Sequence, residues 1–387
     1  MAWVMAADLL TENIGRSRRG GSAEYRLVTA SQITDDWDSL VAGRHPTVRE
    51  RWLRLAPGRL PGENIVFLLE QDGDVQVAVS GVVMDQPAEN TRLDPGAIFS
   101  GAAAVHGLAA SGPHPWREMP ADRLYPCLLL MQTHYELVPV GPAANDVATC
   151  ARLVSQIVRW AEQAGVRSIA AEYLTPEAAA LVTALRGAGF TIIDFASRCD
   201  LDVVWDDFDG YLATLPQRRR SAIRRELRIL EDRGVRIVEL DGGDREDELL
   251  ELRVQLVAKY GGRPNPDKEA ANLAILRHEF SAAELTTFAA IHAGKVMSFG
   301  IFAREGADWI PMLTGSDYDD DYSRLTYFAA LYYRPCQVAP AIGITKIWFG
   351  LGSWEAKRLR GCRLRPLAGA ARLVGHEAML GTADDDE

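Results

Sequence analysis

Apolar positions along this chain recur with two different periods, and the two periods predict strands and helices. In the first half, runs in which every residue or every second residue is apolar are typical of strands, whereas apolar residues spaced three and four apart are typical of helices. The predicted strands are 25–29, 64–69, 75–84, 124–135, 167–173 and 190–204, and the predicted helices are 33–42, 48–55, 145–163 and 176–188. Residues 71–74 predict a hairpin turn, and the Pro- and Gly-rich residues 86–122 predict a surface insertion.

A basic amphipathic helix opens the second half, within residues 215–240. Ile223, Leu227 and Leu230 share one face of this helix, so we expect them to pack on a core. Gly234 is at the expected helix end, and residues 235–240 alternate like a strand. The arginines of this helix are either a solvated face or a docking surface for phosphates, and both interpretations stand. They are Arg218, Arg219, Arg220, Arg224, Arg225 and Arg228.

The rest of the second half repeats the order of the first. The predicted elements are helices at 244–259 and 268–280, a hairpin at 284–304, a strand at 308–314, an acidic loop at 315–323, a helix at 325–339, a strand at 346–350 and a short helix at 354–360. Hairpin, strand, loop, helix, strand and helix therefore occur twice in the same order. Because 387 residues are too many for one ordinary core, we predict two α/β domains, 24–204 and 205–373.

Composition narrows the class of protein. The formal net charge of −11 excludes a general nucleic-acid coat, so a site for a polyanion would have to be local. The five cysteines are scattered without a CxxC pair, which favours reduced thiols in a cytoplasmic protein and predicts no metal site. Residues 1–23 are predicted to be a disordered leader and 374–387 an acidic disordered tail. No stretch is long and apolar enough for a membrane helix, so no membrane partner is expected.

Three segments of the second half resemble a known family. They are QRRRSAIRRELRILEDRG after the short helix DFDGYLATL, then GSDYDDDYSRLTYFAALYY, and finally WFGLGSWEAKRLRGC. In this order and spacing, over residues 205–365, they resemble the BioF2-like or FemAB-like acyltransferases, which are relatives of the Fem-type aminoacyltransferases. The first half resembles the GNAT acetyltransferase unit only in its pattern of elements. The resemblance implies two tandem GNAT-like domains, each a mixed twisted sheet flanked by helices.

The resemblance also implies an activated acyl donor, either aminoacyl-tRNA or acyl-CoA, and no tightly bound cofactor. CoA-dependent GNAT enzymes bind the pyrophosphate of the donor with a glycine-rich turn at a helix N-terminus. The corresponding loops here are 138–146, with one glycine, and 315–324, with four aspartates. Neither loop is typical of a CoA site. This favours a tRNA donor whose phosphates contact the arginines, while CoA bound in an unusual way stays open.

The candidate site residues follow from the resemblance and from their positions after predicted strands. The resemblance places the motif lysine at Lys357, which could stabilise an oxyanion, although a surface lysine at a helix end is the structural alternative. Asp317 and Asp319 could hold the acceptor amine or accept its proton, although acidic loops are usually only solvated. The other candidates for substrate binding are Ser323, which could be only an N-cap, Arg324, Tyr327 and Trp354.

We therefore expect an acyltransferase that forms an amide or ester bond on an amine or hydroxylamine of a small molecule. The resemblance implies a role in specialised metabolism such as antibiotic biosynthesis. Two alternatives remain, namely an acyl-CoA-dependent N-acetyltransferase and a non-catalytic GNAT-like binding protein. His134 and Glu136 stand where a GNAT general base is often found, but a lone histidine at a strand end is more often structural. The sequence motifs of serine hydrolases, P-loop ATPases and HExxH proteases are absent.

Overall fold

The computed structural model describes residues 24–29, 32–33, 37–41, 45–55, 64–102, 113–132, 134–241, 243–260 and 262–375. The chain divides into two compact units. The first unit consists of the chain up to Ser197 together with the chain from Arg365, and the second unit is Arg198–Leu364. The predicted leader, 1–23, and residues 376–387 of the predicted tail lie outside the described residues.

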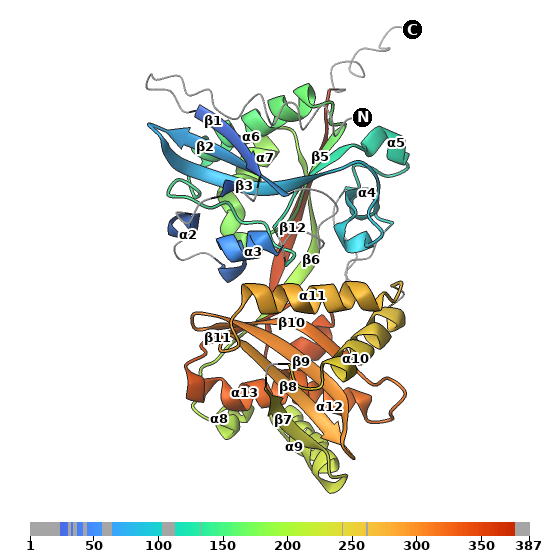
Figure 1. Ribbon diagram of the computed structural model, residues 1–387. Helices are drawn as coiled ribbons and strands as arrows, with labels where there is room; N and C mark the ends of the chain where they lie inside the picture. The colour runs from blue at the N-terminus through green and yellow to red at the C-terminus, as the bar shows by residue number, and fades with distance from the viewer. Residues whose placement is uncertain are drawn as a thin grey trace. The chain divides into compact units, whose positions relative to one another are not determined.

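The first unit is built on a mixed sheet in the order β1-β2-β3-β4-β5-β12-β6 (Figure 1). Its strands are β1 (Glu24–Thr29), β2 (Asn64–Gln71), β3 (Asp74–Met84), β4 (Cys127–Leu130), β5 (Ser168–Leu174), β6 (Thr191–Asp202) and β12 (Arg363–Leu373). β1 to β4 are antiparallel to one another, β4 and β5 are parallel, and β12 is antiparallel to β5. Asp72 and Gly73 turn the β2–β3 hairpin at positive φ, which is typical of a tight hairpin turn.

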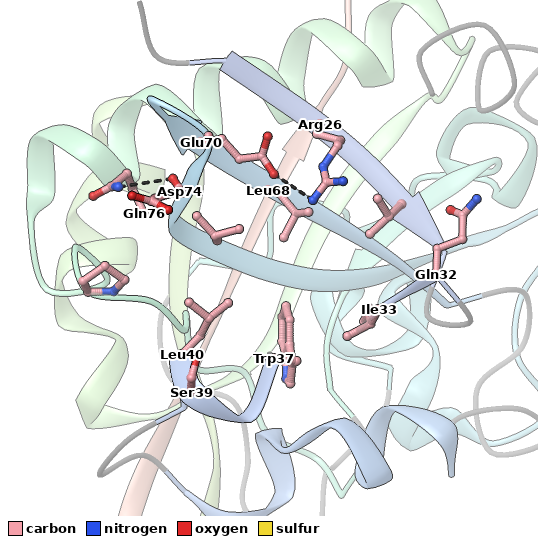
Figure 2. Close-up of a pocket in the computed structure, with 14 residues that line it drawn as sticks. Arg26, Gln32, Ile33, Trp37, Ser39, Leu40, Leu68, Glu70, Asp74 and Gln76 are labelled. Atoms are coloured by element: carbon pink, nitrogen blue, oxygen red, sulfur yellow. Dashed lines mark hydrogen bonds and ion pairs between the residues drawn. The ribbon is translucent and has the colours of Figure 1, made fainter. Parts of the chain in front are cut away.

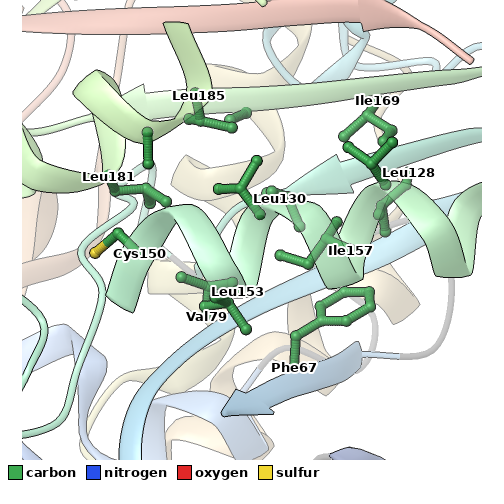
Figure 3. Close-up of a cluster of buried hydrophobic side chains, with 14 of the residues drawn as sticks. Phe67, Val79, Leu128, Leu130, Cys150, Leu153, Ile157, Ile169, Leu181 and Leu185 are labelled. Carbon is green, nitrogen blue, oxygen red and sulfur yellow. The ribbon is translucent and has the colours of Figure 1, made fainter. Parts of the chain in front are cut away.

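Helix α6 (Val147–Gln163) supplies much of the core of the first unit. Its apolar residues recur at helical spacing and pack against the sheet together with α7 (Ala179–Gly187). Figure 3 shows this buried cluster, which includes Phe67, Val79, Leu128, Leu130, Leu153, Ile157, Ile169, Leu181 and Leu185. The shorter helices are α2 (Trp37–Leu40), α3 (Glu50–Arg54), α4 (Pro95–Ser100) and α5 (Ala121–Leu124).

The second unit has a sheet in the order β6-β11-β10-β9-β8-β7. The chain passes from the first unit to the second within β6 and returns within β12. The other strands are β7 (Arg236–Leu240), β8 (Leu285–His292), β9 (Lys295–Glu305), β10 (Asp308–Ser316) and β11 (Lys346–Gly350). Neighbouring strands are antiparallel except β10 and β11, which are parallel.

Helices cover both faces of this second sheet. On one face, α10 (Glu246–Lys259) packs so closely on β10 that a Cβ at Gly315 would lie 2.8 Å from the backbone carbon of Leu252. The core of the other face includes residues from β8, β9 and β10 together with helices that precede and follow them. The remaining helices are α8 (Phe208–Ala213), α9 (Gln217–Asp232), α11 (Pro266–Glu279), α12 (Ser323–Phe328), α13 (Arg334–Val338) and α14 (Trp354–Arg358).

The predicted fold class is confirmed, because each unit is a mixed sheet flanked by helices. Three local predictions differ from the structure. The predicted surface insertion 86–122 contains α4 and the buried side chains of Phe99 and Trp116. The predicted strand 124–135 is reduced to Cys127–Leu130, since its first residue ends α5 and since His134 and Tyr135, at φ of 72° and 59°, turn the chain. The predicted helix 325–339 is interrupted by a π-helical turn, η5 (Ala329–Tyr333).

Strand β12 was not predicted, and it changes how the chain is divided. The predicted second domain ends at residue 373, whereas in the structure residues 365–373 belong to the first unit. The reason is backbone pairing, because β12 is hydrogen-bonded to β5 from Ala368 opposite Leu174 to Leu373 opposite Ser168. The first unit is therefore discontinuous in sequence.

Candidate functional site

The two parallel strands of the second unit separate soon after they begin. β10 pairs with β11 only at Asp308 with Lys346 and at Trp309 with Ile347, and β10 then continues alone on this side to its end. In open α/β sheets, ligands bind outside the carboxyl ends of the strands. The segments that follow these ends, 317–327 after β10 and 354–357 after β11, carry the predicted residues that do not lie on α9.

Lys357 lies in the last turn of α14 and is only 5% exposed. Its ammonium donates to the carbonyl oxygens of Phe349 at 2.7 Å, Gly350 at 3.2 Å and Leu351 at 2.6 Å. An ammonium has three hydrogens, so these three carbonyls at the end of β11 occupy all of them. Lys357 therefore places a fixed positive charge beside the end of β11. The longest bond, to Gly350, is the one most readily exchanged for another acceptor.

The acidic loop after β10 is bonded to itself. The Asp317 carboxylate accepts the N–H of Asp319 at 3.1 Å, and the Asp320 carboxylate accepts the N–H of Tyr322 at 2.7 Å. These backbone N–H groups are the donors that would bind a phosphate in a nest, and the loop's own carboxylates already occupy them. Ser323 is the first residue of α12 and not its N-cap, which is Tyr322.

A cluster of buried hydroxyl groups holds both ends of this loop, at the end of β10 and the start of α12. The hydroxyl of Ser298 in β9 bonds to Ser316 at 2.7 Å and to Thr326 at 2.8 Å. Thr326 also donates to the carbonyl of Ser323 at 3.0 Å, so β9, the end of β10 and α12 are joined. This cluster was not predicted from the sequence. Its only signal in the sequence is a serine within the otherwise apolar run of β9.

Aromatic rings connect Tyr327 with the end of β11. The Tyr327 ring lies 6.3 Å from that of Tyr332, which stacks on Phe349 at 4.5 Å. Because Phe349 also provides a carbonyl to Lys357, Tyr327 and Lys357 belong to the same neighbourhood. Burial raises the pKa of the Tyr327 phenol, so it stays a neutral hydrogen-bonding group. Trp354 packs at the edge of the second unit's core.

The six arginines of α9 divide into two groups. Arg218, Arg224, Arg225 and Arg228 are exposed, and Arg224 pairs with the exposed Asp209 at 2.9 Å. The other two, Arg219 and Arg220, are turned towards the protein. Arg219 pairs with Glu226 at 3.3 Å and donates to the Tyr333 hydroxyl, and Arg220 donates to backbone carbonyls of the preceding turn. Four of the predicted arginines thus form an exposed face, which we call the arginine face.

The inner side of α9 belongs to a buried charged network that the sequence analysis missed. Glu226, Tyr333 and Arg360 meet there, and Arg360 is only 2% exposed. The guanidinium of Arg360 lies 3.2 Å from the centroid of the Phe328 ring and donates to Tyr333 at 3.0 Å. In an arginine-rich sequence a single buried arginine has no distinguishing signal. The network joins α9 to the segments that carry Tyr327 and Lys357.

In the first unit, Glu136 pairs with a histidine that was not predicted from the sequence. Glu136, which follows the bend after β4, lies 2.6 Å from Nδ1 of His45 and accepts the Thr47 hydroxyl at 3.0 Å. His134 instead contacts the edge of the Trp52 ring. At the N-terminus of α6, the Asp146 carboxylate accepts the N–H of Thr149 at 2.8 Å and its hydroxyl at 2.6 Å. These bonds lower the pKa of Asp146. The Asp146 carboxylate therefore occupies the N-terminus of α6, where a bound anion would otherwise accept from the free N–H groups.

One pocket of about 700 Å³ is described in the first unit, between α2 and the strands β1, β2 and β3 (Figure 2). Its apolar wall includes Trp37, Leu40 and Leu68, and Arg26 pairs with Glu70 at 2.7 Å on the strand side. None of the predicted site residues lines this pocket. No group of three or more His, Cys, Asp or Glu residues suited to a metal ion, and no helix suited to crossing a bilayer, occurs in the described part of the chain.

Comparisons with known proteins agree with this architecture. Residues 135–307 match the FemAB-like family, described as peptidoglycan biosynthesis/recognition. No curated protein sequence matches the chain. The structure of FemX is similar with a TM-score of 0.55 and 11% identity, over 90% of this chain and 96% of FemX. A tandem GNAT protein from the clavulanic acid biosynthesis pathway gives 0.53 and 12%, over 92% and 99%.

A conserved protein of unknown function from Bacteroides thetaiotaomicron is similar with a TM-score of 0.53 and 14% identity, over 92% of this chain and all (100%) of the other. At these identities the likeness shows the fold and not the activity. The matched FemAB-like segment begins in the first unit and ends in the second, whereas the sequence analysis placed the likeness within 205–365. The chain therefore has the fold shared by FemX and the tandem GNAT protein, and residues 135–307 are similar to the FemAB-like family.

Proposed function

We propose that this protein is an acyltransferase that forms an amide or ester bond on an amine or hydroxylamine of a small molecule, with aminoacyl-tRNA as the donor. The observation that carries the proposal is the arginine face of α9. Arg218, Arg225 and Arg228 are exposed there and form no ion pair among the described residues. Exposed guanidinium groups on one helix face bind the phosphates of a nucleic acid without reading its sequence.

The hydrogen bonds within the two candidate phosphate loops, 138–146 and 315–324, also favour aminoacyl-tRNA over CoA as the donor. A CoA pyrophosphate needs free N–H groups at a helix N-terminus or in a nest. In the first unit the Asp146 carboxylate occupies this position, and in the second unit Asp317 and Asp320 do. A phosphate at either place would have to displace a carboxylate and would be repelled by it.

We assign the chemical roles to the residues around the separated strands. The acceptor nitrogen attacks the ester carbonyl of the donor, the new C–N bond forms, and the bond to the ribose oxygen breaks. Asp317, with Asp319 beside it, holds the amine and accepts its proton, and the departing ribose oxygen is protonated. The fixed charge of Lys357 stabilises the oxyanion. Ser323, Arg324, Tyr327 and Trp354 line the substrate side.

An acyl-CoA donor is the second candidate. It is favoured by the separation of β10 from β11, which leaves the ends of these two neighbouring strands unpaired with each other, and by the name of one similar structure, a tandem GNAT protein described without AcCoA. In this case the arginine face would contribute nothing to donor binding.

The test is binding of the purified protein to aminoacyl-tRNA, uncharged tRNA and acetyl-CoA under the same conditions. We expect tRNA binding that weakens with salt, and no saturable binding of acetyl-CoA. Replacing Arg225→Ala and Arg228→Ala together should weaken tRNA binding about tenfold and reduce the slope of log Kd against log salt by about 1–2.

The matched control is Arg159→Ala with Arg186→Ala, which removes two exposed arginines from helices of the first unit and should leave tRNA binding unchanged. Equal effects of the two double variants would show that only overall charge matters. Tight binding of acetyl-CoA with no binding of tRNA would reject the proposed donor in favour of the second candidate, and binding of neither would indicate a non-catalytic protein.

A further inference from the structure

The pocket of the first unit, between α2 and the strands β1, β2 and β3, takes no part in the proposed transfer reaction. Its volume of about 700 Å³ falls within the range of roughly 300–1,000 Å³ that is typical of small-molecule sites. Apolar side chains form one part of it, with Trp37 and Leu40 on α2 and Leu68 on β2 (Figure 2). Polar side chains gather on the strand side, where Arg26 and Glu70 form an ion pair. The lining therefore combines an apolar part with a charged part.

Backbone hydrogen bonds hold the walls of this pocket in place. Pro142, which lines the pocket, stands between two residues that are bonded to different walls. The Gly141 N–H donates to the carbonyl of Leu40 in α2 at 3.0 Å, and the N–H of Ala143 donates to β3, to the carbonyl of residue 76, at 2.9 Å. A Cβ on Gly141 would lie 2.5 Å from the carbonyl oxygen of Gln76, so only glycine allows this close approach. The helix wall and the strand wall are therefore held at a fixed separation.

A bulge in β3 lies at the strand side of the pocket. The register of β2 with β3 shifts beside Glu70, which lies opposite Val75, and Gln76 is the extra residue of the bulge. A bulge redirects the side chains around it, and bulges are common next to functional sites. Glu70 therefore lies across from a short stretch of β3 that has Asp74 on one side of Val75 and Gln76 on the other, and all four residues line the pocket.

Three side chains on this side have an oxygen atom that no described residue occupies. Glu70, whose side chain is 15% exposed, pairs with Arg26 through Oε1 at 2.7 Å, which leaves its Oε2. The Gln76 amide donates from Nε2 to the backbone carbonyl of Asp74 at 3.2 Å, which leaves its Oε1, and the Asp74 carboxylate forms no bond to any described residue. A primary ammonium has three hydrogens, so these three acceptors suit it. One arginine and two carboxylates give the lining a net charge of −1, which also favours a cation.

We propose that this pocket binds a small amphipathic amine, an apolar body that carries one primary ammonium group. The ammonium is held by the carboxylates of Glu70 and Asp74, and the apolar body lies against Trp37 and Leu68. An anionic ligand would meet Arg26 but would be repelled by the two carboxylates. The site requires no acyl donor and lies within the first unit, so this proposal and the proposed transfer reaction can each fail without the other.

The test is calorimetric titration of the intact protein, at neutral pH, with four related compounds. We expect saturable binding of phenethylamine, about tenfold tighter than that of 2-phenylethanol, which has the same apolar body without the charge. Ethylamine, which has the charge without the apolar body, should also bind at least about tenfold more weakly. 3-Phenylpropanoate, which carries the opposite charge, should bind most weakly. Added salt should weaken the binding of phenethylamine and leave that of 2-phenylethanol unchanged.

Three variants locate the ligand. Asp74→Asn should weaken phenethylamine binding about fivefold and leave 2-phenylethanol binding unchanged, because only the charge is lost. Arg26→Gln should tighten phenethylamine binding a few-fold, since it removes the cation that competes for Glu70. Val75→Phe fills the pocket and should abolish the binding of both compounds. The control is Asp72→Asn, which removes an exposed carboxylate of the same hairpin that does not line the pocket, and it should bind as wild type does.

Each of four results would overturn the proposal. Phenethylamine could give no saturable heat, which would mean that the pocket holds no such ligand. 3-Phenylpropanoate could bind as tightly as the amine, which would make Arg26 and not the carboxylates the charged contact. Asp72→Asn could weaken amine binding as much as Asp74→Asn does, which would show that only overall charge matters. Arg26→Gln could weaken amine binding, which would mean that the arginine supports the pocket and does not compete for Glu70. Should Val75→Phe fail to fold, the variants at the two exposed side chains Arg26 and Asp74 still decide the matter.

Discussion

Lys357 and Glu172 are both buried, and they show two opposite ways in which a protein treats a buried ionisable group. Lys357 meets three carbonyl oxygens, so each of its hydrogens has an acceptor. Glu172 has no hydrogen-bond partner among the described residues, and burial raises its pKa well above its ordinary value. Because fully satisfied buried charges stabilise geometry and unsatisfied ones destabilise the fold, we assign Lys357 to positioning within the transfer site.

Replacing Lys357→Met should destabilise the second unit, since the three carbonyls at the end of β11 would lose their donor. We expect a loss of about 2–4 kcal/mol in the free energy of unfolding, measured by urea denaturation, together with loss of acyl transfer. The control is Arg358→Met at the next position, which is exposed and only approaches the Trp354 ring at 5.8 Å. An unchanged unfolding midpoint in Lys357→Met would mean that these three bonds contribute nothing.

Prediction from the sequence was most specific, and also most incomplete, for single residues. Lys357 could be selected because a family motif places a lysine there. Arg360, Glu226 and Glu172 could not be selected, because the sequence does not distinguish a buried charged residue from a solvated one. Only the tertiary structure shows that these three side chains are enclosed.

Among the elements, α9 was predicted best, since its apolar spacing depends on the helix alone. Ile223 and Leu230 are buried and Leu227 is partly buried, as their shared face required. The arginines were harder to place, because six of them spread around the helix and only packing decides which face outward. Arg219 and Arg220 are turned inward by contacts with Tyr333 and with the preceding turn. The separation of β10 from β11 could not be predicted from the sequence, because no residue pattern in either strand indicates it.

At the N-terminus of α6, the Asp146→Ala variant tests whether the carboxylate serves the protein itself. Loss of the cap should reduce stability by about 1 kcal/mol, which lowers Tm by about 2–4 °C in a unit of this size, as measured by differential scanning calorimetry. The control is Glu162→Ala, an exposed position of the same helix, which should shift Tm by much less. If Asp146→Ala instead bound acetyl-CoA tightly, the helix would be a donor site that the carboxylate merely blocks.

For the molecule as a whole, the sequence predicted two similar units but not how the chain is shared between them. The repeated order of elements was enough for the first conclusion. The second depended on β12, whose run of alanine, glycine and proline has no strand signal of its own and whose partner, β5, is distant in sequence. Strand pairing over such separations is decided by the folded sheet and not by local preference.

Ending the chain after Leu364 should therefore unfold the first unit, although all of β1–β5 remains. β5 and β6 would each lose the strand between them and expose unpaired backbone groups. The measurement is hydrogen exchange at the β5 amides, which should lose their protection. The control is a chain ended after Gly375, which keeps β12 and should retain full protection. Protected β5 amides in the shorter chain would show that β12 is dispensable.

The position of β12 also sets an order of events during synthesis. Roughly 190 residues separate Leu174 from Arg365, so the ribosome needs about 10–40 s between delivering β5 and delivering its partner. All of the segment Arg198–Leu364 emerges in this interval and can fold first. The strands β1–β5 must then wait, with an open sheet edge, until β12 is translated, and a chaperone that covers this edge would act on a chain in which Arg198–Leu364 has already been made.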